Sequence, residues 1–349
     1  MVSAKPSPTR SDDIAATLLA WYDANARRLP WRSPPGTPPP DPYRVWLSEV
    51  MLQQTTTAAV GPRFTAWTAR WPDFASFAAA ADADVMAAWA GLGYYARARN
   101  LLAAARAIVA DGLPTTEAGW RALPGVGAYT AAAVAAIAFG ERAVVVDANV
   151  ERVVARLFAI ATPLPAARAA IRAAADSITP AERAGDFAQA MMDLGATICT
   201  SRRPRCLLCP LAATCRGRAE GDPERLPVKP AKPTRPRRFG TVFWLEDAGR
   251  LWLVRRPAKG LLGGMRALPT GPWCDAPPGL ADAPARTDWR ILDTVVGHGF
   301  THFELELALA VGRGHAHDDA GEWWPVDDLA DAGLPTIFAK CVTAIGRAA

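Results

Sequence analysis

Four of the six cysteines lie within one short stretch of the chain. They are spaced C-x6-C-x2-C-x5-C, at Cys199, Cys206, Cys209 and Cys215. Four crowded thiols in a reducing compartment indicate a metal site rather than two disulfides, because a positively charged centre stabilises thiolates that would otherwise repel one another. Structural zinc is usually held by two C-x2-C pairs, and this stretch has only one. The spacing therefore favours an iron–sulfur cluster, with structural zinc as the alternative.

A carboxylate in the first fifty residues lies in a stretch predicted to be helical. The residues three and four positions away from Glu49 are mostly apolar, namely Val45, Trp46, Leu52 and Gln53. Loss of hydration beside such neighbours raises the pKa of a carboxyl group, so that it stays protonated near neutral pH and can donate a proton. The alternative is a glutamate at the rim of an amphipathic helix, without a chemical role.

A second carboxylate, Asp147, follows the apolar run 143–146 and precedes a predicted helix that begins at Asn149. This is the position of a helix N-cap, where the amides of the first turn favour an ionised carboxylate. An anion held in this way could stabilise a cation that develops beside it. The alternative is a cap with no further role.

A glycine-containing turn joins two predicted helices. The sequence Leu123-Pro124-Gly125-Val126-Gly127 precedes the helical stretch 128–139. Glycine permits a tight turn whose backbone approaches a ligand closely, and the amides at the start of the next helix suit a phosphate group. Many helix pairs need such a turn, so an ordinary connection is the alternative.

The elements that must position these residues change character along the chain. Half of the 349 residues are apolar, which indicates a globular protein with room for two domains. The alanine-rich first two hundred residues predict helices, and the later part predicts short strands and a C-terminal helix over 337–347. The predicted helices are 12–27, 43–59, 82–90, 96–110, 128–139, 149–159 and 166–177. The predicted strands are 241–245, 251–254, 291–296 and 303–310.

Residues 218–238 separate the two parts. From Gly221 to Arg238 the sequence is GDPERLPVKPAKPTRPRR, whose prolines and cations predict an extended tether. The part before Gly240 carries 29 Lys and Arg against 20 Asp and Glu, whereas the rest carries 10 against 14, so the first part favours a polyanionic partner. No apolar run is long enough for a membrane span, and Met1–Arg10 lacks the apolar core of a secretory signal, so a cytoplasmic location is expected.

Several longer stretches are similar to known DNA-repair enzymes. Residues 29–32 (LPWR), 46–55 (WLSEVMLQQT), 91–100 (GLGYYARARN) and 189–196 (QAMMDLGA) resemble the MutY family of base-excision glycosylases, and the match spans roughly 24–215. The cysteine spacing resembles both this family and endonuclease III. The resemblance implies a mainly α helix–hairpin–helix domain over 10–217, with the hairpin at about 115–140. It also implies a [4Fe–4S] cluster held by the cysteines of the loop 199–215.

The resemblance further implies a partner and a mechanism. The partner is double-stranded DNA with adenine opposite 8-oxoguanine or guanine, bound by a monomer, at the nucleoid in a bacterium. The adenine is flipped out of the duplex, one acid protonates it, and one anion stabilises the sugar cation that is left. The resemblance assigns the first role to Glu49 and the second to Asp147, which would bond transiently to the sugar.

The same resemblance assigns roles to further positions. Supporting hydrogen-bonding positions are Tyr129 and Asn149. Positions around the adenine pocket are Trp31, Arg32, Leu52, Gln189 and Asp193. Positions that enter the base stack are Gln54 and one of Tyr94 and Tyr95, and those that hold the DNA backbone are Gly125 and Gly127.

Two other functions fit parts of the pattern. Endonuclease III enzymes act on oxidised pyrimidines and also nick the strand through a Schiff base, and in them a lysine occupies the position of Tyr129. This chain has no lysine between Pro6 and Val228, which predicts an enzyme without strong strand cleavage. The other alternative is a non-catalytic iron–sulfur protein that binds DNA or senses redox state, which the presence of both Glu49 and Asp147 disfavours.

The residues after the tether resemble the Nudix-like C-terminal domain of MutY enzymes, which predicts an α/β domain over 239–349 that recognises 8-oxoguanine. Gly260–Met265 is similar to a loop of that domain, but Arg266-Ala267-Leu268-Pro269 replaces the family's Trp-Glu-Phe-Pro and leaves that loop's contacts open. No run of glutamates like a Nudix metal site occurs, so no nucleotide hydrolase activity is expected. Phe300-Thr301-His302 resembles the family's Phe-Ser-His loop, and threonine keeps the serine hydroxyl. A surface β-turn is the alternative.

Overall fold

The computed structural model describes residues 11–89, 91–230, 234–257, 260–317 and 320–348. These residues form two compact units, one built from 11–85 and 96–230, the other from the described part of 234–348 together with that of 86–95. Met1–Arg10, Ala90 and residues 231–233 of the expected tether lie outside the described residues. In the described ranges, no helix is both long and apolar enough to cross a membrane.

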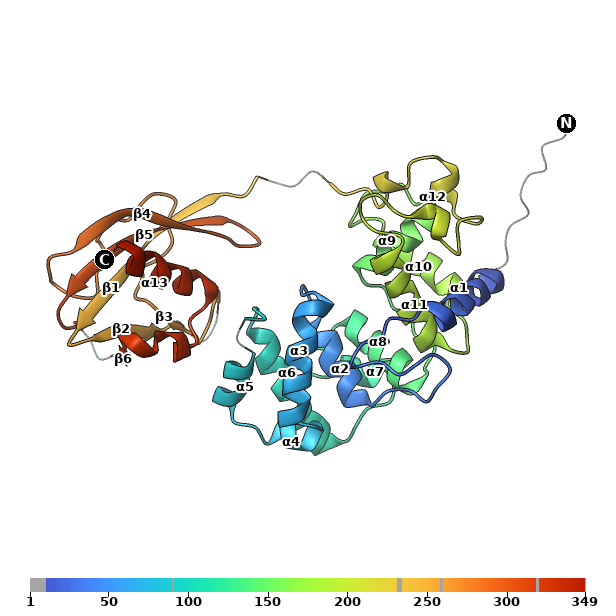
Figure 1. The fold of residues 1–349 in the computed structure, drawn as a ribbon, viewed down its shortest axis with the longest axis horizontal. Helices are drawn as coiled ribbons and strands as arrows, with labels where there is room; N and C mark the ends of the chain where they lie inside the picture. The colour runs from blue at the N-terminus through green and yellow to red at the C-terminus, as the bar shows by residue number, and fades with distance from the viewer. Residues whose placement is uncertain (1–10, 90, 231–233, 258–259, 318–319, 349) are drawn as a thin grey trace. The chain divides into compact units, whose positions relative to one another are not determined.

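The first unit consists of helices joined by short loops (Figure 1). Its alanine-rich stretches are helical, as the sequence predicts. Its helices are α1 (Ser11–Asn25), α2 (Pro42–Met51), α3 (Thr57–Arg70), α4 (Phe74–Ala78), α6 (Ala96–Asp111), α7 (Glu117–Arg121), α8 (Ala128–Phe139), α9 (Ala148–Leu157), α10 (Arg168–Ile178), α11 (Ala184–Thr197) and α12 (Arg216–Ala219). Helix α5 (Asp82–Ala88) runs from this unit into the segment 86–95. The chain stays attached to this unit as far as Val228, whose carbonyl oxygen accepts a 2.8 Å bond from the Leu164 amide.

The predicted helix over 43–59 is wrong in extent, because two helices occupy this region. Pro42 begins α2, where the missing amide hydrogen costs nothing, and Asp41 caps the helix through the amides of its first turn. Gln54 then takes a positive φ of 60°, which no helix tolerates, and Thr56 caps α3. The break puts Gln54 in an exposed turn just after α2.

Helix α11 has no counterpart among the predicted elements. Nearly all of its residues are buried, so the sequence shows no polar face to mark it as amphipathic. Two glycines allow this burial. A Cβ at Gly185 would lie 2.4 Å from the Ala136 carbonyl oxygen in α8, and a Cβ at Gly195 would lie 2.6 Å from the Asn149 Cβ in α9. Helix α11 therefore packs closely against both α8 and α9.

The second unit is a mixed sheet with a helix against one face (Figure 1). The strand order is β3-β2-β1-β5-β4, with β6 paired to β2, and only β1 and β5 are parallel among the pairs of this sheet as described. The apolar side of α13 packs into the core through Ile337, Phe338, Cys341 and Ile345. Its elements are β1 (Arg237–Asp247), β2 (Arg250–Arg255), β3 (Arg266–Ala267), β4 (Arg290–Gly299), β5 (Glu304–Arg313), β6 (Gly321–Pro325), the 3-10 turn Val326–Ala332 and α13 (Thr336–Ala348). This is the α/β fold expected from the sequence.

The loop residues that depart from the family pattern find partners inside this unit. Arg266 donates two bonds to the Glu322 carboxylate, at 2.6 and 3.2 Å, and its guanidinium lies 4.3 Å from the centre of the Trp324 ring. Ala267 and Leu268 are fully buried in the core. Arg266 is therefore held within the unit by contacts between β3 and β6.

Candidate active site

Glu49 projects from α2 into the interior of the first unit. Only 6% of the residue is exposed, and its helix neighbours Val45 and Trp46 are buried as expected. The Tyr129 hydroxyl donates a 2.6 Å hydrogen bond to Glu49 Oε2. Burial raises the pKa of Glu49 to about 7, against the lowering effects of the Tyr129 bond and the charge of Arg32, and with a small further rise from Asp147. Glu49 can therefore hold and release a proton near neutral pH.

Tyr129 reaches Glu49 from the first turn of α8, directly after the glycine turn. Burial and the nearby carboxylates hold the pKa of this phenol well above its usual value, so it stays protonated and acts as a donor. The bond spans 80 residues of sequence. It engages Oε2 of Glu49.

Glu49→Gln should make the protein harder to unfold at about pH 8. The carboxyl group has a pKa of about 7 in the folded state, against an ordinary value of 4.5. The folded wild-type protein therefore binds a proton on Glu49 that the unfolded chain has already released. The contribution of this proton to the free energy of unfolding is full below about pH 4.5. It is lost as the pH rises through about 7, by up to about 1.4 kcal/mol per pH unit. Urea unfolding should show the advantage of the glutamine variant growing from about pH 5 to about pH 8. An equal difference at both pH values would contradict the raised pKa.

Asp147 is the N-cap of α9, as the sequence predicts. Its Oδ1 accepts a 2.7 Å bond from the Val150 amide, and its Oδ2 accepts a 2.8 Å bond from the Asn149 side chain. Both oxygens are thus oriented by the first turn of the helix. The carboxylate is half-buried, and its charge is close enough to Glu49 to affect the pKa of that group. The two carboxyl groups are therefore close enough to interact, one buried in the unit and the other oriented by the start of a helix.

Arg152 connects this cap to the cysteine loop. Its guanidinium donates to Asn149 Oδ1 at 2.9 Å, to the Gly195 carbonyl at 2.7 Å and to the Cys199 carbonyl at 2.7 Å. One turn later the buried Arg156 donates to the Thr200 carbonyl at 2.7 Å. The loop that begins at Cys199 is therefore braced against the helix that Asp147 caps. Sequence patterns gave no sign of this link.

The four loop cysteines line one cavity. The other lining residues are Ile198, Ala212 and Pro223, with the cations Arg156 and Arg218. Burial, together with the neighbouring thiols, raises the pKa of Cys209 to about 11, and the same causes raise the pKa of Cys215. Such thiols become thiolates only beside a strong positive centre. Across the described residues, no three His, Cys, Asp or Glu side chains converge as the ligands of a single metal ion would. Four thiols that line one cavity are a ligand set that an iron–sulfur cluster can use.

The residues expected around the adenine pocket are mostly buried in the first unit. Asp193 is fully buried and pairs with Arg32 Nη1 at 2.7 Å and with Arg27 Nε at 2.6 Å. Trp31 is buried edge-on against Phe64, with 5.2 Å between the ring centres. Arg32, which also lowers the pKa of Glu49, is therefore held by Asp193. The sequence reasoning missed Arg27, because no spacing rule links residues 166 positions apart.

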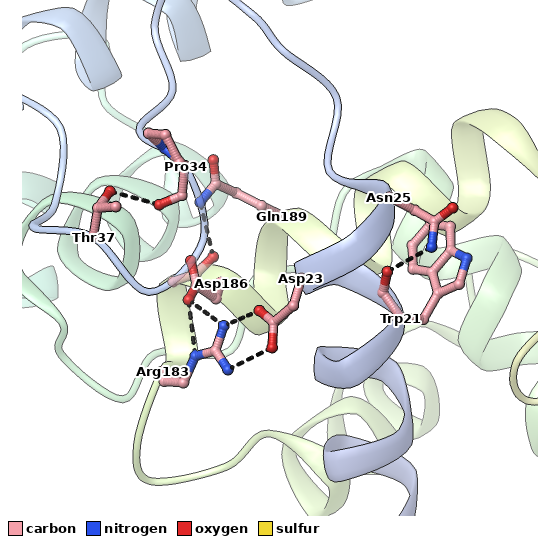
Figure 2. A network of polar contacts seen from close by, with 9 residues as sticks. Trp21, Asp23, Asn25, Pro34, Thr37, Arg183, Asp186 and Gln189 are labelled. Atoms are coloured by element: carbon pink, nitrogen blue, oxygen red, sulfur yellow. Dashed lines mark hydrogen bonds and ion pairs between the residues drawn. The ribbon is translucent and has the colours of Figure 1, made fainter.

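The beginning of α11 completes this region. Figure 2 shows Arg183, at the helix start, reaching both Asp186 and Asp23 of α1. The side-chain amide nitrogen of the buried Gln189 donates a 3.4 Å hydrogen bond to the Gly185 carbonyl oxygen. The side-chain oxygen of Gln189 is not used in this bond and can accept from another donor. Leu52 is half-buried just after α2. Ties between α1 and α11 thus bring Arg27 to Asp193.

The glycine turn has the geometry that the sequence suggested. Gly125 has a φ of 72°, and a Cβ there would lie 2.5 Å from the Asn100 Cβ, so only glycine fits. Gly127 caps α8 without a side-chain bond, and a Cβ there would meet no protein atom within 4 Å. The first amides of α8 therefore have no side-chain cap from Gly127. Tyr94, with 54% of its surface exposed, and the half-buried Tyr95 belong to the segment 86–95.

The expected lesion loop lies between β4 and β5 of the second unit. Thr301 and His302 are exposed at its tip, whereas Phe300 is half-buried. The Phe300 amide donates a 2.9 Å bond to the Phe303 carbonyl, which closes the turn. The hydroxyl and the imidazole are thus free of the core and can meet a ligand.

Fold and site together define a helix–hairpin–helix DNA-repair protein with a Nudix-type second unit. Residues 47–178 match the HhH-GPD superfamily of base excision DNA repair proteins, and residues 241–344 match the NUDIX domain family. Adenine DNA glycosylases from Mycolicibacterium smegmatis and Homo sapiens are each 43% identical to this chain, over 209 and 219 residues. The chain belongs to the adenine DNA glycosylase family.

The matches cover different shares of the relatives. The M. smegmatis match covers 59% of this chain and 70% of the M. smegmatis protein. The human match covers 60% of this chain and 40% of the human protein. The chain spans about half the length of the Arabidopsis thaliana relative, at 48%, with 37% identity over 304 residues. A solved thermostable thymine-DNA glycosylase has a TM-score of 0.53 and 28% identity, over 60% of this chain and 97% of its own. Endonuclease III in a non-covalent DNA complex shares the fold, with a TM-score of 0.51 and 22% identity. That match covers 62% of this chain and 98% of the endonuclease III chain.

Proposed function

We propose that this protein removes adenine from DNA where it is mispaired with 8-oxoguanine or with guanine. The observation that carries the proposal is the pairing of Glu49, whose pKa lies at about 7, with the oriented anion Asp147 in one site. Relatives that are 43% identical to this chain over their matched regions are named adenine DNA glycosylases. The amides at the start of α8, which no side chain caps, support binding of a DNA phosphate. We further propose that the protein acts as a monomer.

The reaction begins when the adenine leaves the base stack and enters the site. Glu49 then transfers its proton to the departing base, which converts a poor leaving group into a neutral one. The sugar becomes cationic as the bond breaks, and Asp147 stabilises that cation and bonds to it transiently before water replaces the bond. Asn149 and the Val150 amide hold the carboxylate in place throughout. Trp31, Arg32 and the residues near Asp193 form the adenine pocket.

The protein is proposed to release the base without cutting the strand. Strand cleavage by this class of chemistry requires an amine that forms a Schiff base with the opened sugar. Tyr129 stands beside Glu49 and carries a phenol, and the sequence from Pro6 to Val228 contains no lysine. Over the described residues 11–89 and 91–228 there is therefore no lysine amine that could form this Schiff base.

We also propose that the cysteine cavity holds one [4Fe–4S] cluster, bound by Cys199, Cys206, Cys209 and Cys215. Its role would be structural, because Arg152 and Arg156 of α9 donate hydrogen bonds to the backbone of this loop. A cluster that orders the loop would therefore also stabilise α9. Cys206→Ser should therefore lower the iron content from about four per chain and reduce the thermal stability of the first unit. Cys274→Ser, outside the loop, is the control and should keep its iron. Full iron content in the Cys206 variant would contradict the ligand set.

The test of the function uses three duplexes, with adenine opposite 8-oxoguanine, adenine opposite guanine, and thymine glycol opposite adenine. Base release is scored by strand scission with and without hot alkali. The proposal expects scission only at adenine, only after alkali, and faster opposite 8-oxoguanine. Scission at thymine glycol without alkali would instead favour an oxidised-pyrimidine glycosylase and lyase. Binding without any base release would favour a non-catalytic protein.

A further inference from the structure

The exposed tip of the loop between β4 and β5 rests on a column of aromatic rings. The Phe300 ring stacks on the Trp273 ring, with 5.4 Å between their centres and 28° between their planes. Phe303 lies 4.9 Å from Phe300, and His298 meets the same ring edge-on at 4.6 Å. The position of Phe300 is therefore fixed by its neighbours, and Phe300 anchors the loop.

The base of this column is part of the sheet. Backbone bonds of 2.8 Å run in both directions between Phe239 of β1 and Cys274, the residue after Trp273. A Cβ at Gly240 would lie 2.8 Å from Trp273 Cδ1, so glycine at this position makes room for the indole. Trp273 thus cannot shift without disturbing β1. Because Phe300 stacks on Trp273, the sheet also restrains the position of Phe300.

Arg256, the residue after β2, completes the column. Its guanidinium carbon lies 4.8 Å from the centre of the Trp273 ring, and its Nε donates a 3.2 Å bond to the Leu261 carbonyl. Among the described residues, no carboxylate lies within ion-pair distance of it. Burial lowers the pKa of Arg256, as expected for a cation that lacks an acidic partner. A half-buried cation in this position holds the indole and links the 260–265 loop to it.

We propose that Arg256 and Trp273 are positioning residues that set the preference for adenine opposite 8-oxoguanine over adenine opposite guanine, by holding the loop 300–302 in place. This inference rests on the proposed function. The two bases differ by one carbonyl oxygen and one N–H, so discrimination depends on one or two hydrogen bonds, each of modest strength. Groups such as Thr301 and His302 can make that distinction only when the loop that carries them is fixed to within about half an ångström.

The test measures the ratio of single-turnover rate constants on the two duplexes. Arg256→Met keeps an unbranched apolar stem but removes the guanidinium group with its charge and planarity. It should lower the ratio roughly threefold to tenfold, with adenine opposite guanine processed at nearly the wild-type rate. Trp273→Phe retains an aromatic ring. Its ratio of rate constants should therefore fall less than the ratio of Trp273→Ala. The matched control is Arg255→Met, one residue earlier and exposed, which should keep the wild-type ratio.

A second readout does not depend on catalysis. Hydrogen exchange of the amides over 300–303 should accelerate in Arg256→Met, whereas the amides of β1 and β5 should stay protected. If Arg256→Met keeps both the wild-type ratio and the wild-type exchange, or if Arg255→Met lowers the ratio equally, the inference is wrong and the proposed function stands. If the wild-type protein itself shows no preference for the lesion, lesion recognition is wrong and this inference falls with it.

Discussion

Replacement of Glu49 by glutamine should reduce adenine release by roughly 10²- to 10⁴-fold while leaving the affinity for mispaired duplex near that of the wild type. Glutamine has the same shape, and its carbonyl oxygen can still accept the bond from the Tyr129 hydroxyl. It has no proton of suitable acidity to give to the departing base. Single-turnover rates and equilibrium binding, measured on the same adenine–8-oxoguanine duplex, separate the two effects.

The control for this substitution is Glu182→Gln, which neutralises an exposed glutamate of the same unit and should leave the rate unchanged. The pH profile gives an independent check. Because the protonated form of Glu49 is the active one and its pKa is about 7, the rate of the wild-type protein should fall as the pH rises above that value. A glutamine variant that cuts at the wild-type rate, or a wild-type rate that rises with pH, would exclude Glu49 as the acid.

Asp147→Asn should reduce the rate by roughly 10²-fold or more, and the protein should remain folded. Asparagine is as good an N-cap as aspartate, so the bond from the Val150 amide can persist. What is lost is the negative charge that stabilises the sugar cation and the nucleophile that bonds to it. The measurement is the single-turnover rate, together with thermal unfolding to show that α9 is intact.

Asp73→Asn supplies a matched control, because Asp73 also caps a helix of this unit and accepts a 2.8 Å bond from the Ser76 amide. Both substitutions replace a capping carboxylate by an amide, but only Asp147 adjoins the proposed reaction centre. Asp73→Asn should therefore keep the wild-type rate. Equal losses in the two variants would mean that the cap, and not the charge at the reacting sugar, accounts for the effect.

Local patterns predicted much of this fold, and they failed where burial is uniform. The helices near 96–110 and 128–139 and the strands near 241–245 and 251–254 lie where periodicity and composition placed them. Helix α11 was missed because both of its sides are buried, so it has no polar face. The break after α2 was missed because a residue in the left-handed conformation, Gln54, carries no compositional signature comparable to glycine.

The sequence by itself determined the features that depend on neighbours within one or two turns. These are the apolar surroundings of Glu49, the N-cap position of Asp147, the glycine turn and the spacing of the four cysteines. Only the tertiary structure decided which of these features meet: Tyr129 with Glu49 across 80 residues, and Arg27 with Asp193 across 166. The physical reason is that periodicity fixes which face of a helix is buried. Which partner covers that face depends on close packing across the whole core, which no local pattern encodes.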